Sequence, residues 1–161
     1  MNDRSDVALP TRLLSAATYL IPLMEGIMFG TFLFKQFPIL QVVLVPLIPL
    51  IRVYNSIPFG RLLIFFLLFF AVVRNENLDR FIRFNAMQSV LLSIVLSISS
   101  LILSLFVSGL QQSSPLLLET LVNTLFLGVI AAVVYSLVQC LRGHYPELPA
   151  LSDAAKMQVP Y

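Results

Sequence analysis

Glu25 is one of two acidic residues that fall within the long apolar stretches of this chain. It lies in the run 13–34, which is otherwise interrupted only by Pro22. An ionised acid at the centre of a membrane-spanning helix costs about 2.5–3.5 kcal/mol, so such a residue is a functional candidate by default. Lys35 and Arg61 are conceivable partners for this intramembrane acid. The alternative is that Glu25 reaches the outer interface or pairs for structural reasons alone.

Small and polar residues recur at helical spacing in three of the apolar runs. The steps of three and four residues place each set on one helical face, and such faces serve tight packing or hydrogen bonding between membrane helices. We expect these faces to turn toward one another, as packing surfaces or as the lining of a wet path for a polar or peptide substrate. The most regular set is Asn85, Ser89, Ser93, Ser97, Ser100, Ser104 and Ser108, followed by Thr120, Thr124, Gly128, Ala131, Tyr135 and Gln139, and by Ser15, Tyr19, Pro22, Gly26 and Gly30.

Basic residues alternate with apolar ones in the segment 74–85. Arg80 and Arg83 are interleaved with Phe81, Ile82 and Phe84, and Arg74 precedes them. This pattern suits a turn that holds cations at the lipid headgroups on the cytoplasmic side, where Lys and Arg concentrate. The alternative is a docking surface for a partner.

Several classes of chemistry are not indicated. A single cysteine, Cys140, cannot form an internal disulfide, and a single histidine, His144, cannot build a zinc site of three or four ligands. The sequence shows no Ser/His/Asp set, no glycine-rich phosphate loop and no paired carboxylates on one face. The scattered cations form no basic patch for nucleic acid. We therefore expect no enzyme, no cofactor and no nucleic-acid partner.

The composition indicates what must position these residues. Of 161 residues, 58% are hydrophobic and only 11% are charged, whereas a soluble domain carries about 25% charged residues. The mean hydropathy is +0.93. Too few ionic groups remain to cover a water-exposed surface, so the chain is predicted to be an all-α, polytopic membrane protein in contact with the lipid bilayer.

Four transmembrane helices are expected, because a span needs about 20 mostly apolar residues. The intervening segment 38–51 carries three prolines and is expected to be a short interfacial or re-entrant element between the first and second spans. The membrane domain would cover 12–143, between tails of residues 1–11 and 144–161. The four predicted spans are 13–34, 57–73, 86–108 and 117–141.

Charge placement favours four spans with both termini inside. Seven basic residues then fall inside and three outside, whereas a five-span arrangement gives at best six against four. The inside set is Arg4, Arg12, Arg74, Arg80, Arg83, Arg142 and Lys156, and the outside set is Lys35, Arg52 and Arg61.

Five stretches of the sequence resemble the Tic20 family of plastid inner-envelope proteins and their cyanobacterial relatives. They are FGTFLFKQFP (29–38), NSIPFG (55–60), VRN (73–75), RFIRFNAMQ (80–88) and YPELP (145–149). The resemblance runs from about residue 12 to 155, and RFIRFNAMQ is its most specific block. It implies a four-helix membrane protein with both termini cytoplasmic or stromal. Plant members carry a transit extension that this sequence does not show, which favours a cyanobacterial or plastid-encoded origin.

The resemblance implies a subunit of a preprotein translocation complex that contributes to a protein-conducting channel. The expected partners are other translocon subunits, the transported precursor polypeptide and further copies in a homo- or hetero-oligomer. The expected location is a cyanobacterial cell membrane or the plastid inner envelope. Two alternatives stay open: a small-solute permease or channel that uses Glu25, and an assembly scaffold for a membrane complex.

Overall fold

The computed structural model describes residues 7–159, and within this range every regular element is a helix. The expected all-α architecture is confirmed. Residues 1–6 of the expected N-terminal tail, which include Arg4, and residues 160–161 of the C-terminal tail lie outside the described range.

The first membrane passage, Leu9–Gln36, is a chain of short helices. It contains α1 (Leu9–Thr18), α2 (Leu20–Ile27), the 3-10 turn η1 (Met28–Gly30) and α3 (Thr31–Gln36). The break between α1 and α2 has a cause in the sequence: Pro22 has no N–H to donate to the carbonyl four residues earlier, that of Thr18. The hydroxyl of Ser89 donates to the Thr18 carbonyl instead, at 2.6 Å. The break is thereby held by a second helix.

The next part of the chain is bent at a right angle. α4 (Leu40–Leu44), η2 (Val45–Leu47) and α5 (Ile48–Ser56) lead into α6 (Gly60–Leu67) and the π-helix η3 (Leu68–Val73). The segments 40–56 and 60–73 meet at 99°. At 1.5 Å per residue the 14 residues from Gly60 to Val73 rise about 21 Å, which is short of a ~30 Å hydrocarbon core.

Two long helices complete the bundle. α7 (Arg80–Ser113) and α8 (Pro115–Arg142) are joined at Ser114, so the helix continues through most of the turn-rich stretch 109–115. The described residues thus contain three helices long and apolar enough to cross a membrane, and a fourth span if the bent pair is counted as one. This is the polytopic helical fold that the sequence predicts.

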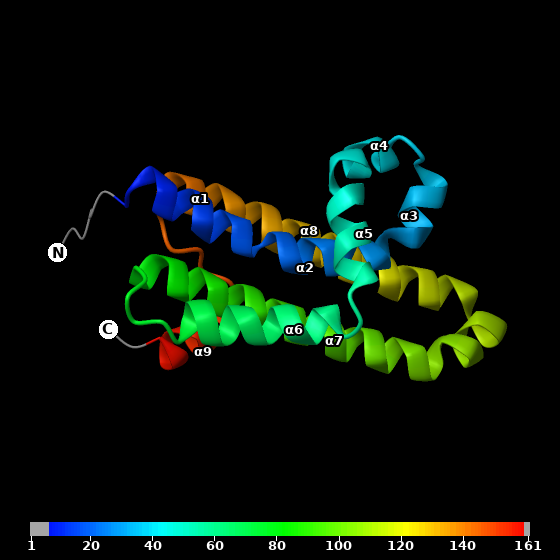
Figure 1. The fold of residues 1–161 in the computed structure, drawn as a ribbon. Helices are drawn as coiled ribbons and strands as arrows, with labels where there is room; N and C mark the ends of the chain where they lie inside the picture. Colours follow the sequence, from blue (N-terminus) through cyan, green and yellow to red (C-terminus); the bar gives the residue numbers. More distant parts are fainter. Residues whose placement is uncertain (1–6, 160–161) are drawn as a thin grey trace.

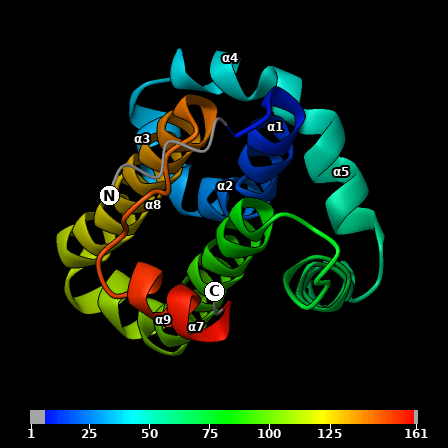
Figure 2. The same ribbon diagram turned by 90° about the vertical axis from the view of Figure 1, so that its left-hand side faces the viewer.

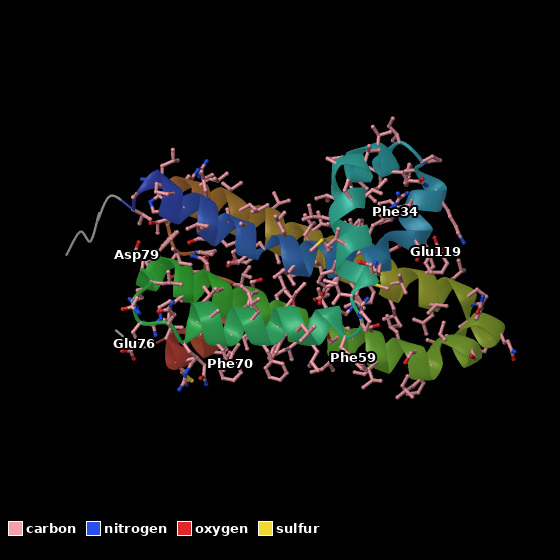
Figure 3. The ribbon with its side chains drawn as sticks, in the orientation of Figure 1. Phe34, Phe59, Phe70, Glu76, Asp79 and Glu119 are labelled. Atoms are coloured by element: carbon pink, nitrogen blue, oxygen red, sulfur yellow. The ribbon has the colours of Figure 1, made fainter. Side chains whose placement is uncertain are left out.

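The helices pack around a core between α1–α2, α7 and α8 (Figure 2). η3 packs against α7, and α5 stands across the bundle (Figure 1). The start of α1, the loop 74–79 and the C-terminal helix α9 (Leu151–Gln158) lie at one end of the bundle, which we call the basic end (Figure 1). Glu76 and Asp79 lie at that end, and Glu119 lies toward the other (Figure 3).

Candidate functional site

Two cavities lie on the serine-bearing face of α7 and share the lining residues Glu25, Arg61 and Ser97. We call them together the Glu25 cleft; their volumes are about 350 and 270 Å³. Along α7 their lining extends from Val90 to Gln111. That separation of 21 residues corresponds to about 32 Å of helix rise, close to the ~30 Å thickness of a hydrocarbon core. Taken together, the two cavities border a length of α7 comparable to the thickness of a hydrocarbon core.

The serine series of α7 is divided by the fold. Ser89 is fully buried and Ser93 is 8% exposed, whereas Ser97, Ser100 and Ser104 are exposed. Ser93 and Ser97 line the smaller cavity, and Ser97, Ser100 and Ser104 line the larger one. Apolar side chains complete the walls, among them Phe29, Phe32, Phe65, Leu118 and Val122. Four of the predicted serines thus lie along one cleft, while Ser108 is exposed and does not line it.

Glu25 is held in the cleft by a residue from a distant part of the chain. The hydroxyl of Tyr54 in α5 donates to Glu25 Oε1 at 2.7 Å. Glu25 Oε2 is buried and has no hydrogen-bond partner among the described residues. Arg61 lines the same cleft, but its guanidinium donates to the Met28 thioether at 2.8 Å. Among residues 7–159 the ion pair within 4 Å joins Lys156 and Asp153, so neither Lys35 nor Arg61 forms one with Glu25.

The glycines of the first passage make a close contact with α8. A Cβ on Gly26 would lie 2.5 Å from Val129 Cγ1, and one on Gly30 would overlap Phe34 and approach Phe126. Val129 and Phe126 are buried. The Gly26/Gly30 face therefore packs against the apolar face of α8.

The polar face of α8 points away from the rest of the chain. The hydroxyls of Thr120 and Thr124 donate to carbonyls of their own helix, each at 2.7 Å, and a Cβ on Gly128 would meet nothing within 4 Å. All three residues are exposed. The expected meeting of three small or polar faces is thus not formed within one chain, because α8 presents branched and aromatic side chains to the glycines instead.

A second group of polar side chains is buried near the basic end. The Tyr19 hydroxyl lies 2.9 Å from Gln88 Oε1 and 3.1 Å from Asn85 Oδ1. Gln88 Nε2 donates to Ser152 Oγ at 2.7 Å, and Cys140 Sγ lies 3.1 Å from Asn85 Oδ1. Gln88 thus links the first passage to α9, and we call these five residues the Gln88 network.

The three predicted basic residues lie in α7 and just before it. Arg83 Nε donates to the Val73 carbonyl at 2.9 Å, which ties the end of η3 to α7. The Arg80 guanidinium lies 5.9 Å from the centre of the Tyr145 ring. Arg74 is exposed. Two of the three predicted basic residues therefore contact other segments: Arg83 the end of η3, and Arg80 the segment that leads to α9.

Sequence reasoning placed Asn85 and Tyr19 on polar helical faces, but it did not single out Tyr54, Gln88 or Ser152 as parts of a site. Asn85 and Gln88 lie in the RFIRFNAMQ block, so the block itself carried a signal. Tyr54 carried none, since it lies in α5, beyond the proline-broken segment, and meets Glu25 only through the turns of the chain between α2 and α5. Among the described residues, no group of three or more His, Cys, Asp and Glu side chains could hold a metal ion.

Comparison with known proteins relates this architecture to one family. A family model described as "Chloroplast import apparatus Tic20-like" matches residues 8–155. A "Tic20 family protein" of Synechocystis sp. is 46% identical over 148 residues, covering 92% of each chain. "Protein TIC 20-v, chloroplastic" of Arabidopsis thaliana is 37% identical, covering 92% of this chain and 70% of its own. "Tic20 family protein Ycf60" of Gracilaria tenuistipitata var. liui is 32% identical, covering 98% of this chain and 79% of its own.

Proposed function

The chain belongs to the Tic20 family, and from this premise we propose that it is an integral membrane subunit of a protein translocation complex whose Glu25 cleft contributes to the path of the transported polypeptide. The family model is named for the chloroplast import apparatus, which supports a role in protein translocation. The observation that carries the path is the cleft itself, whose lining follows α7 for about 32 Å. The polypeptide meets serine hydroxyls on one wall and apolar side chains on the other.

The grouping of charges supports an orientation for the subunit. Arg12, Arg74, Arg80, Arg83 and Arg142 belong to the ends of α1, α7 and α8 and the loop between η3 and α7, at the basic end of the bundle. Because Lys and Arg concentrate on the cytoplasmic side, this end faces the cytoplasm or stroma and both termini lie there. The membrane is a cyanobacterial cell membrane or a plastid inner envelope.

The outward polar face of α8 supports assembly with further subunits. Thr120, Thr124 and Gly128 offer a small surface of the kind that membrane helices use for close packing. A cleft bounded by one chain is also narrow for a polypeptide, so its missing wall comes from a second copy or another translocon subunit. Blue-native electrophoresis in mild detergent should show a mass above the monomer, and a monomer alone would count against assembly.

Site-specific crosslinking tests the path. In a chain with Cys140→Ser, single cysteines are placed at Ser97, Ser100 or Ser104, and a precursor is stalled in membranes by a folded C-terminal domain. We expect crosslinks at these positions to exceed those at two matched outward positions of the same helix, Ile102 and Phe106, by about tenfold. Crosslinks at the outward positions alone, or none at any position, would remove the cleft from the path.

Glu25 favours one other function, a small-solute permease. Its buried Oε2 has no partner among the described residues, and a free intramembrane carboxylate is typical of ion and proton pathways. In proteoliposomes, Glu25→Gln should then abolish cation-coupled uptake of solute. Unchanged flux would leave the translocation subunit as the better description.

A further inference from the structure

The Glu25 cleft contains hydrogen-bonding atoms that the chain itself does not use. Glu25 Oε2 is buried without a partner among residues 7–159, and the same holds for Ser93 Oγ, whose residue is only 8% exposed. Both residues line the smaller cavity. Buried polar groups in proteins nearly always have a partner, because leaving them without one is costly. These two atoms therefore mark a place that an atom from outside the chain completes.

Arg61 brings a donor to the same space. It lines both cavities, and its guanidinium donates to the Met28 sulfur. A thioether is a weak acceptor, and a guanidinium carries five N–H donors. Donors of Arg61 thus remain available for a stronger acceptor in the cleft.

Opposite charges around one cleft restrict the chemistry of what binds there. An anion attracted to Arg61 would meet the Glu25 carboxylate, and a cation attracted to Glu25 would meet the Arg61 guanidinium. A neutral group with a donor on one side and an acceptor on the other satisfies both residues. Each peptide unit of an extended polypeptide is such a group, and inside a bilayer its N–H and C=O find no partner in lipid.

We propose that Glu25 and Arg61 bind the main chain of a polypeptide in the cleft, with a peptide N–H donating to Glu25 Oε2 and a peptide C=O accepting from Arg61. This inference rests on the proposed function and names what the site recognises. Tyr54 is a positioning residue, because its hydrogen bond to Oε1 holds the carboxylate and leaves Oε2 for the ligand. Since the contacts are with the backbone, binding does not depend on the side-chain sequence of the polypeptide.

Photo-crosslinking of synthetic peptides to the full chain in liposomes tests this recognition. The peptides have about 20 residues, enough to cross a ~30 Å core when extended, and carry a central benzoylphenylalanine. One is neutral, one contains lysines, one contains glutamates, and one is the neutral peptide with N-methylated central amides. We expect the neutral peptide to crosslink best, and N-methylation, which removes the N–H donors, to lower its yield at least about tenfold.

Variants of the chain separate main-chain binding from charge recognition. Glu25→Leu and Arg61→Leu should each lower the yield with the neutral peptide about tenfold. Glu25→Gln keeps a carbonyl acceptor and should stay within about threefold of the parent, and the outward control Ile102→Leu should leave the yield unchanged. The buried Cys140 reacts with a maleimide dye only when the chain unfolds, so a melting curve followed with this dye shows that each variant is folded.

Three results would overturn the inference: equal crosslinking of the N-methylated peptide, no crosslinking of any peptide, or a preference for the lysine peptide together with equal losses in Glu25→Gln and Glu25→Leu. The last pattern would identify a cation site. None of these results decides the proposed function, which the stalled-precursor crosslinks test separately. If those crosslinks fail while the neutral peptide still binds as described, the cleft is a main-chain site of another kind of protein.

Discussion

Two glycines in the same bundle offer a matched test of how α2 packs against α8. In Gly26→Ala the new methyl group would lie 2.5 Å from Val129 Cγ1 and 3.3 Å from Val129 Cβ. In Gly128→Ala it would meet nothing within 4 Å. Both positions are inside helices, so the two substitutions share the same change in helix propensity and differ in the space around the methyl group.

The expected difference in the free energy of unfolding between the two variants follows from these distances. Replacing Gly by Ala in a helix interior favours the helix by about 0.5–1 kcal/mol, which makes Gly128→Ala neutral to slightly stabilising. Overpacking a well-packed contact costs about 1–3 kcal/mol. Because the propensity terms cancel, Gly26→Ala should be less stable than Gly128→Ala by about 1–3 kcal/mol. For a chain of this length that corresponds to about 2–12 °C in melting temperature.

The single cysteine supplies the assay. Cys140 is fully buried, so a maleimide dye that fluoresces on reaction with thiols reports unfolding in detergent micelles. The melting temperatures of the parent and both glycine variants are compared at equal detergent concentration. Adding Val129→Ala to Gly26→Ala removes the branched side chain that the new methyl group would contact. The double variant should therefore lose less stability than the sum of the losses in the two single variants.

One outcome would refute the packing described for α2 and α8. If Gly128→Ala destabilised the chain as much as Gly26→Ala, the outward face of α8 would be packed as tightly as the inward one. Additive losses in the double variant would likewise show that Gly26 and Val129 do not touch.

Three further substitutions test other contacts with the same dye. Gln88→Leu removes the hydrogen bonds to Tyr19 and Ser152 and should lower the free energy of unfolding by about 1–3 kcal/mol, at roughly 0.5–1.5 kcal/mol per bond. An unchanged free energy of unfolding would mean that α9 is held without the Gln88 network. Ser89→Ala leaves the carbonyl freed by the proline of the first passage without its donor and should cost about 1–3 kcal/mol, which a stability equal to the parent's would contradict. Phe59 has a left-handed backbone with φ of 56° and is 82% exposed. Phe59→Gly should therefore stabilise the chain by about 1 kcal/mol, whereas Phe59→Ala keeps the backbone strain and should not. Equal stability of the two variants would show that the backbone there is unstrained.

The fold class and the chemistry of the first passage follow from the sequence. Long uncharged runs can satisfy their backbone in a bilayer only as helices, so the spans around α7 and α8 are set by composition. The Gly26 and Gly30 spacing marks a helical face that a neighbour can approach closely, whatever that neighbour is. Pro22 likewise requires a break, because it has no N–H for the preceding turn.

Which faces meet was decided by the tertiary structure. Lipid is as apolar as leucine, so no hydrophobic force turns the polar face of α8 inward, and shape decides instead. Val129 and Phe126 fill the space that Gly26 and Gly30 leave, and Thr120 and its neighbours therefore point outward. The meeting of Tyr54 with Glu25 depends on how the short helices between α2 and α5 turn the chain back, which helical periodicity cannot encode because periodicity describes each helix alone.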